Sequence, residues 1–343
     1  MKSLKKATYS MIFLILFVGI TSCSTNEIKQ NTEDSLQRKN INVVLADLDW
    51  ESVKAHNDLA SYLIEKGYGY KTSKISGRSN PLRESLKSGS IDVVMEYWVI
   101  DKKTYENDIN NDFFEELSIN FNDYTQGAYI PRYMVEGDKK RGIRATAQGL
   151  TDLKDLLKYK DVFLKEGEQN PKIISLAKTF ALEGQESWKK KLENYNITSE
   201  FKMIEPENGE ELKKSAIKAY ENGEPWIGYY WSPSSMISKY DFIRLKEAPY
   251  DKEIYETTGM CENPNYNITI VASPQLKNNA PEVYELLKNY KTSSEITNKL
   301  LSISQQSGHI SEGNMKKFLR ENEGLWKNWV TKEAYENIIK TIK

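Results

Sequence analysis

Residues 41–98 alternate between short β-rich runs and stretches with helical periodicity, and this alternation constrains the fold more than any other feature of the chain. Apolar residues recur at helical spacing between residues 53 and 64, after Asp49, whose side chain is expected to cap this helix. A second helix is expected to begin at Asn80-Pro81. Strands are expected at residues 41–46 (INVVLA), 70–76 and 91–98 (IDVVMEYW). This order of strand, helix, strand, helix, strand predicts a parallel α/β sheet.

The remainder of the chain continues in the same way and ends in helices. Strands are expected at residues 200–204, 226–230 and 267–272, and helices at residues 187–195 and 209–222. After Pro281, helical periodicity covers residues 282–290, 294–304, 315–328 and 333–342. The 343 residues are enough for two packed domains. The predicted fold class is therefore α/β, with a helical cover at the C-terminus.

Residues 1–22 are expected to be a targeting segment that does not belong to the folded body. An apolar run over residues 11–20 follows a lysine-rich start and is too short to span a bilayer comfortably. Its end, Ile20-Thr21-Ser22-Cys23, resembles the lipobox of bacterial lipoproteins, which implies that residues 1–22 are a signal peptide removed before Cys23 is lipidated. The alternative is a secretory signal followed by an unrelated cysteine. Residues 24–40 are polar and are expected to form a flexible tether. The protein is therefore expected outside the cytoplasm, anchored to the membrane through Cys23.

Composition and missing motifs exclude several classes of function. Basic and acidic residues number 48 and 49, so the net charge of -1 gives no general attraction for nucleic acid or anionic lipid. If Cys23 is lipidated, Cys261 has no disulfide partner, and the two histidines add little toward a metal site. Motifs for nucleotide binding and hydrolysis are absent, and His56 and His309 are interpreted as a core and a surface histidine. We expect neither an enzyme nor a cofactor nor a metal.

Three of the seven tryptophans stand where predicted strands end. Trp50 follows the first strand, Trp98 ends the third, and Trp231 ends the strand near residue 230. Ligands of open α/β sheets bind beyond the carboxyl ends of the strands. A trimethylammonium group has no N–H to donate, so a protein holds it with aromatic faces, each worth roughly 0.5–2 kcal/mol. The three indoles therefore indicate a site for a quaternary-ammonium compound, and the alternative is ordinary core packing.

Six segments between about residue 41 and residue 330 stand in a characteristic order and spacing: ADLDWES, EKGYGY, LKSGSIDVVMEYW, YIPRYMVE, IGYYWSP and SEGNMKKFLRENEGLWKNW. In these segments the chain resembles the glycine betaine, proline betaine and choline-binding proteins of osmoprotectant ABC transporters. The resemblance implies a two-lobed periplasmic-binding-protein fold of type II, with the ligand in a cleft between the lobes. The first lobe would comprise residues 41–122 and 246–343, and the second lobe residues 123–245.

The resemblance also implies a cage of aromatic residues divided between the lobes, with Trp50 and Trp98 on the first and Trp231 on the second. A fourth aromatic of the family cage has Gln126 at its matching place here, and the neighbouring Tyr124 is the preferred substitute. Choline binders of the family carry an acid two residues after the first cage tryptophan, where this chain has Ser52, which favours a betaine.

Donors for the carboxylate of a betaine are expected from the backbone around Asp49, with help from Ser52. Glu168 is interpreted as a surface residue, the alternative being that it faces the cation of the ligand. The partners implied are the permease and ATPase subunits of an ABC importer, which receives the ligand. The alternatives are that a protein of the same fold binds another solute, namely carnitine, choline, a sulfonium osmolyte or a cationic amino-acid derivative, or that it is a sensory surface lipoprotein.

Overall fold

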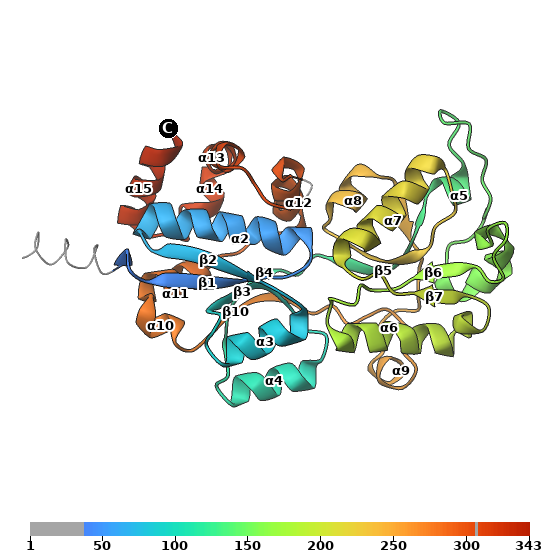
Figure 1. The fold of residues 1–343 in the computed structure, drawn as a ribbon, viewed down its shortest axis with the longest axis horizontal. Coiled ribbons are helices and arrows are strands. Elements are labelled where there is room, and N and C mark those ends of the chain that lie inside the picture. The colour runs from blue at the N-terminus through green and yellow to red at the C-terminus, as the bar shows by residue number, and fades with distance from the viewer. Residues whose placement is uncertain (1–37, 306–307) are drawn as a thin grey trace, which may run out of the picture.

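The computed structural model describes residues 38–305 and 308–343, so the predicted signal peptide, Cys23 and most of the tether lie outside the described residues. Two five-stranded sheets divide the described chain into two lobes that lie side by side (Figure 1). We call the part built around the sheet that begins with β1 the first lobe, and the part built around the other sheet the second lobe. In the described residues, no helix has the length and apolar character needed to cross a bilayer.

The sheet of the first lobe has the order β2-β1-β3-β10-β4. β1 runs parallel to β2 and β3, as the sequence pattern predicts, whereas β10 runs antiparallel to β3 and β4. The reversal follows from the path of the chain. β10 begins as the chain returns from the second lobe, so Ile268 at its start pairs with Trp98 at the end of β3. The strands are β1 (Asn42–Asp47), β2 (Lys71–Ser76), β3 (Val93–Trp98), β4 (Glu115–Phe121) and β10 (Ile268–Ala272).

Helices cover both faces of this sheet (Figure 1). α2 (Glu51–Leu63) continues into a π-helical turn over Ile64–Tyr68 and ends at Gly69, which has the left-handed conformation common at helix ends. α2 lies on one face with the last four helices, and α3, α4, α10 and α11 lie on the other. Their bounds are α3 (Ser79–Lys87), α4 (Lys102–Asn110), α10 (Leu276–Asn279), α11 (Pro281–Asn289), α12 (Ser294–Ile303), α13 (Glu312–Glu321), α14 (Glu323–Trp326) and α15 (Lys332–Ile342).

The sheet of the second lobe has the order β7-β6-β8-β5-β9. β6 is parallel to β7 and β8, and β5 is antiparallel to β8 and β9. The strands are β5 (Thr125–Pro131), β6 (Lys172–Ile174), β7 (Lys202–Ile204), β8 (Gly228–Ser232) and β9 (Phe242–Arg244). The α-helices are α5 (Tyr133–Glu136), α6 (Leu182–Asn194), α7 (Gly209–Asn222), α8 (Ser235–Lys239) and α9 (Lys252–Thr257), and two 3-10 helices span Leu153–Phe163 and Ile197–Ser199.

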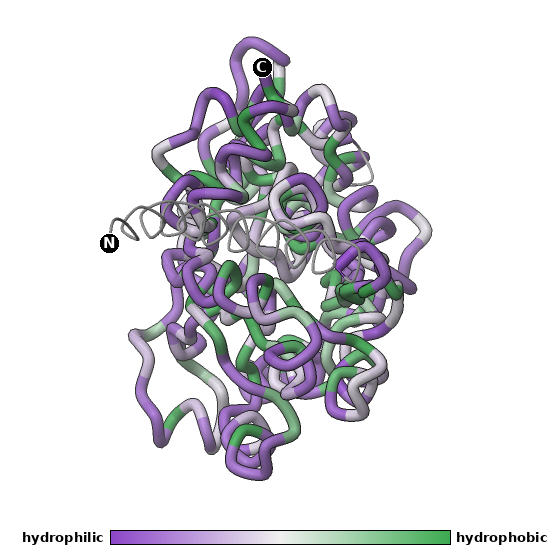
Figure 2. The backbone as a smooth tube through the Cα atoms, turned by 90° about the vertical axis from the view of Figure 1, so that its left-hand side faces the viewer, coloured by the Kyte–Doolittle hydropathy of each residue, from purple (hydrophilic) through white to green (hydrophobic). Residues whose placement is uncertain are grey.

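Each lobe has its own apolar core. A view along the long axis shows apolar segments gathered inside and hydrophilic segments on the outer turns (Figure 2). Four of the tryptophans are buried, and His56 is fully buried in α2, as its helical spacing predicts. The buried tryptophans are Trp188, Trp226, Trp326 and Trp329. These four tryptophans therefore pack in the cores of the lobes.

The chain crosses between the lobes twice, at residues 122–124 and again between β9 and β10. Lys191 of α6 holds the second crossing against the second lobe. Its ammonium lies 2.7 Å from the Glu247 carboxylate and donates to the carbonyl oxygen of Cys261 at 2.7 Å. The side chains of Lys191 and Glu247 are each only 2% exposed, so this ion pair is buried.

Candidate ligand-binding cleft

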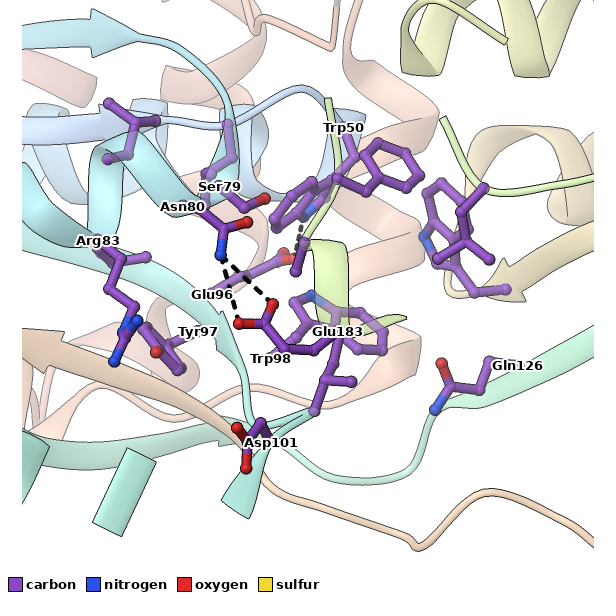
Figure 3. A pocket seen from close by; sticks show the side chains of 18 of the residues that line it. Trp50, Ser79, Asn80, Arg83, Glu96, Tyr97, Trp98, Asp101, Gln126 and Glu183 are labelled. Carbon is purple, nitrogen blue, oxygen red and sulfur yellow. Dashed lines mark hydrogen bonds between the residues drawn. The ribbon is translucent and has the colours of Figure 1, made fainter. Parts of the chain in front are cut away.

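A cavity lies between the two lobes, at the carboxyl ends of β1 and β3. Both lobes supply its walls, and Figure 3 shows that Trp50, Glu96 and Trp98 lie on one side and Gln126 on the other. The lining residues of the first lobe are Leu48, Trp50, Ser79, Asn80, Leu82, Arg83, Val94, Glu96, Tyr97, Trp98, Ile100, Asp101 and Thr104. Those of the second lobe are Gln126, Leu176, Phe180, Ala181, Glu183, Tyr229 and Trp231.

The structure brings the three tryptophans at strand ends to this one cavity. Trp50 stands between β1 and α2, Trp98 is the last residue of β3, and Trp231 lies near the end of β8. All three are half-buried, unlike the other four tryptophans, which are buried. Trp50 packs against the cores of both lobes. The indoles therefore have surface available to a bound molecule.

Phe180 is an aromatic wall that the sequence analysis missed. Its ring lies edge-on to Trp50 at 5.8 Å and to Trp231 at 5.5 Å, so it connects the tryptophans of the two lobes. Phe180 comes from the turn after β6, a strand of three residues that is too short to give a clear periodic signal. A sequence signal for β6 would have indicated that Phe180 follows the end of a strand, as the tryptophans do.

The structure places Tyr124 behind Trp98 and not on the cavity wall. The two rings meet edge to face at 4.8 Å. The Tyr124 hydroxyl accepts the backbone N–H of Tyr266 at 3.2 Å, which fixes it against the segment returning to β10. Tyr124 therefore supports the Trp98 ring from outside the cavity.

A buried carboxyl group lies at the wall of the cavity, beside two of the indoles. Glu96 Oε2 accepts a hydrogen bond from Trp50 Nε1 at 2.7 Å (Figure 3). It also accepts one from Ser52 Oγ at 3.0 Å. Burial raises the pKa of Glu96 to about 7, although the hydrogen bonds from Trp50 and Ser52 oppose this rise. Ser52 is itself buried and does not line this cavity, so its hydroxyl donates to Glu96 and not to a bound molecule.

Asp49 and Glu51, on either side of Trp50, reach across to the second lobe. Asp49 Oδ2 accepts hydrogen bonds from Thr179 Oγ1 at 2.6 Å and from the backbone N–H of Gly209 at 2.7 Å. Asp49 therefore does not cap α2, contrary to the sequence prediction. The N-cap of α2 is Trp50, without a side-chain hydrogen bond, while Asp49 meets the first residue of α7 instead. A negative charge is stabilised at such a helix N-terminus.

Glu51 makes the matching contact with α8. Its carboxylate accepts the backbone N–H of Ser235 at 3.1 Å and the hydroxyl of Ser235 at 2.6 Å, and it lies 2.9 Å from Lys213 Nζ. The lobes also approach closely at Gly209, where a Cβ atom would lie 2.3 Å from the backbone oxygen of Asp49. A bond from Asn80 to Glu183 joins the lobes as well, on the wall of the cavity (Figure 3).

Replacing Asp49 with alanine is expected to weaken ligand binding by about fivefold, because the closed state loses two charge-assisted hydrogen bonds. The dissociation rate should carry most of the change, since the lost contacts form only on closure. Stopped-flow tryptophan fluorescence measures this rate. The control is Asp161→Ala, which removes an exposed carboxylate of the second lobe. Equal dissociation rates for Asp49→Ala and the wild type would exclude a role for these bonds in closure.

Glu168 lies away from the cavity, where its carboxylate pairs with Lys172 at 2.5 Å. This placement agrees with the interpretation of Glu168 as a surface residue. His309 is half-buried and its Nδ1 lies 3.3 Å from Asp58. In the part of the chain that the structure describes, no cluster of three or more His, Cys, Asp or Glu residues could hold a metal ion.

Comparisons with known proteins agree with this architecture. The chain is similar to a glycine betaine/L-proline-binding protein of Borrelia burgdorferi (20% identity, TM-score 0.66), covering 87% of this chain and 99% of the other. It is also similar to lactococcal OpuAC in a closed conformation with glycine betaine (17% identity, 85% and 100% coverage, TM-score 0.64). A third similar structure is an ABC-transporter choline-binding protein with choline (18% identity, 88% and 98% coverage, TM-score 0.66).

These likenesses show the predicted fold, a two-lobed periplasmic-binding-protein architecture of type II. No curated protein sequence matches the chain significantly. The family model described as the substrate-binding domain of ABC-type glycine betaine transport systems matches residues 41–321, which is most of the chain. The chain therefore belongs to this family of ABC-transporter substrate-binding proteins.

Proposed function

We propose that this protein captures a quaternary-ammonium compound in an aromatic cage between its lobes and delivers it to the permease of an ABC importer. The observation that carries the proposal is the convergence of Trp50, Trp98, Trp231 and Phe180 on one cavity. A methylated nitrogen offers no hydrogen-bond donor, so aromatic faces are the groups that can hold it. Each face contributes roughly 0.5–2 kcal/mol, so four can supply several kcal/mol.

The division of the cage between the lobes couples binding to closure. Trp98 belongs to the first lobe and Trp231 to the second, so a ligand contacts both only when the lobes meet. The ligand then favours the closed state by the contacts that exist only there. Asp49 and Glu51 add their bonds to the second lobe in the same state. A closed, loaded protein is the form that we propose the permease recognises.

The proposed location is outside the cytoplasm, with the protein anchored to the membrane through lipidated Cys23. The signal-like start of the chain and its lipobox support this location. The function needs no chemistry on the ligand, and the family consists of transport proteins. A sensory lipoprotein that uses the same cleft is the second candidate. An adjacent permease and ATPase gene would favour transport over sensing.

A panel of ligands tests the proposal with the purified protein. Glycine betaine, proline betaine, choline and carnitine are compared by thermal shift and tryptophan fluorescence, with unmethylated glycine as the matched control. A methylated ligand should raise the melting temperature by several degrees and change the fluorescence, because indoles form its site. Glycine should do neither. If no methylated compound acts while another class of solute does, the proposed ligand class is wrong.

A further inference from the structure

The charged groups that line the cavity are mostly acidic. Glu96, Asp101 and Glu183 each present a carboxyl group, and among the lining residues in the described ranges Arg83 alone is basic. The guanidinium of Arg83 is already paired with Asp108, donating from Nε at 2.7 Å and lying 2.5 Å from the same carboxylate oxygen through Nη2. A zwitterionic ligand would therefore bring its carboxylate into a cavity with an excess of negative charge, whereas a cation would be stabilised there.

Among these carboxyl groups, Glu96 is the one buried against the cage. Its side chain is fully buried and lies beside Trp50, through the hydrogen bond from the indole N–H, and beside Trp98 on the same strand. Glu96 Oε1 has no hydrogen-bond partner among the residues that the structure describes and lies 3.6 Å from His56 Nε2. The histidine ring is engaged by Tyr290 and Thr297. A buried carboxylate with an unpaired oxygen needs a positive charge nearby to compensate its lost hydration.

We propose, on the basis of the proposed function, that Glu96 is a specificity-determining residue, which makes the cage select a quaternary-ammonium cation without a carboxylate over a zwitterionic betaine. A choline-type compound has this chemistry. The fold brings Glu96 to the hydroxyl of Ser52 and to the indole N–H of Trp50. The negative charge beside the cage therefore comes from β3. This assignment reverses the preference for a betaine that Ser52 alone suggests.

The charge of Glu96 depends on pH in the neutral range. Burial raises its pKa to about 7, whereas burial lowers the pKa of neighbouring His56 to about 3, so His56 stays neutral above pH 5. The Tyr290 hydroxyl also faces His56, and Asp101, Glu183 and Arg83 face the cavity from the other elements. Raising the pH from 5.5 to 8.5 ionises Glu96 and should strengthen choline binding by about tenfold, because the cation favours the ionised carboxylate. The affinity for betaine should not rise, because the carboxylate of the betaine is repelled by the negative charge of ionised Glu96.

Isothermal titration with choline and glycine betaine at pH 5.5 and 8.5 tests the assignment. The wild type should bind choline more tightly at pH 8.5, and the ratio of choline to betaine affinity should rise by about tenfold with pH. Glu96→Gln keeps an oxygen that accepts from Trp50 but removes the charge. It should lower this ratio by about tenfold at pH 8.5 and abolish its pH dependence. Glu106→Gln, an exposed carboxylate of α4, is the control and should behave as the wild type.

A purely structural role of Glu96 in holding the indoles predicts a different result, namely equal losses for both ligands in Glu96→Gln. That result, or a wild-type ratio that does not change with pH, would overturn the assignment. The wild-type pH series decides the matter even if Glu96→Gln does not fold. Tighter binding of betaine than of choline at both pH values overturns the role of Glu96 but leaves the proposed function standing. Failure of both ligands to bind overturns both proposals.

Discussion

Replacing Trp98 with alanine is expected to weaken binding of the quaternary-ammonium ligand at least tenfold, about 1.4 kcal/mol. The change removes one π face of the cavity, namely the ring that Tyr124 holds in place from outside. Trp98→Phe keeps a smaller face and should give an intermediate affinity. Titration calorimetry measures the dissociation constants of the wild type and both variants.

Two further variants make this expectation specific. Trp231→Ala removes an aromatic face that the second lobe supplies to the cage. It should lower the affinity for the ligand by a similar factor, because the cage needs both lobes. Tyr250→Ala removes an aromatic side chain that is 45% exposed and does not line the cavity, so its affinity should match the wild type. Dissociation constants within twofold of the wild type for both tryptophan variants would show that these indoles do not hold the ligand.

Replacing Lys191 with methionine is expected to lower the free energy of unfolding by about 3–5 kcal/mol, because it leaves Glu247 buried without its partner. The change also leaves the carbonyl of Cys261 without its donor. Chemical denaturation measures the loss. The double variant Lys191→Met/Glu247→Gln should recover much of it, since most of the cost is that of an unpaired buried charge.

The pH dependence of the Lys191→Met variant provides a second check. Burial raises the pKa of Glu247, and in the wild type Lys191 opposes this rise. Without Lys191, the folded state gains by protonating Glu247, so the deficit in stability should shrink as the pH falls. Lys158→Met, which breaks an exposed ion pair with Asp155, should leave the melting temperature nearly unchanged. A deficit no larger than that of Lys158→Met would mean that the buried pair does not stabilise the protein.

Periodicity alone located most of the regular elements. The predicted helix at residues 209–222 coincides with α7, and the predicted strand at 91–98 contains β3. The prediction of a parallel sheet is only partly confirmed, because β10 runs antiparallel to its neighbours. The direction of β10 depends on the path of the chain between β9 and β10, which no local sequence pattern indicates. The residue type of Asp49 predicts a helix cap. Its carboxylate instead bonds to Gly209, a residue 160 positions away.

The candidate site was predictable where a residue type is unusual for its position. The tryptophans are unusual residues to find at strand ends, and the structure brings them to one cavity. Glu96 was not predictable in this way, because it lies within a strand whose first four residues are all buried, so no alternation marks the side that faces the cavity. Its environment depends on Ser52 and His56 from α2, which only the folded chain brings near.

The turn between β1 and α2 places Asp49, Trp50 and Glu51 in succession, with a cavity-lining ring between two carboxylates that reach the starts of α7 and α8. Three consecutive residues therefore combine contact with the cavity and contact between the lobes. Any redesign of ligand preference that alters Trp50 would also alter docking. Gln126 lines the cavity from β5, away from this turn, so the wall there can change while the contacts of Asp49 and Glu51 with the second lobe are retained.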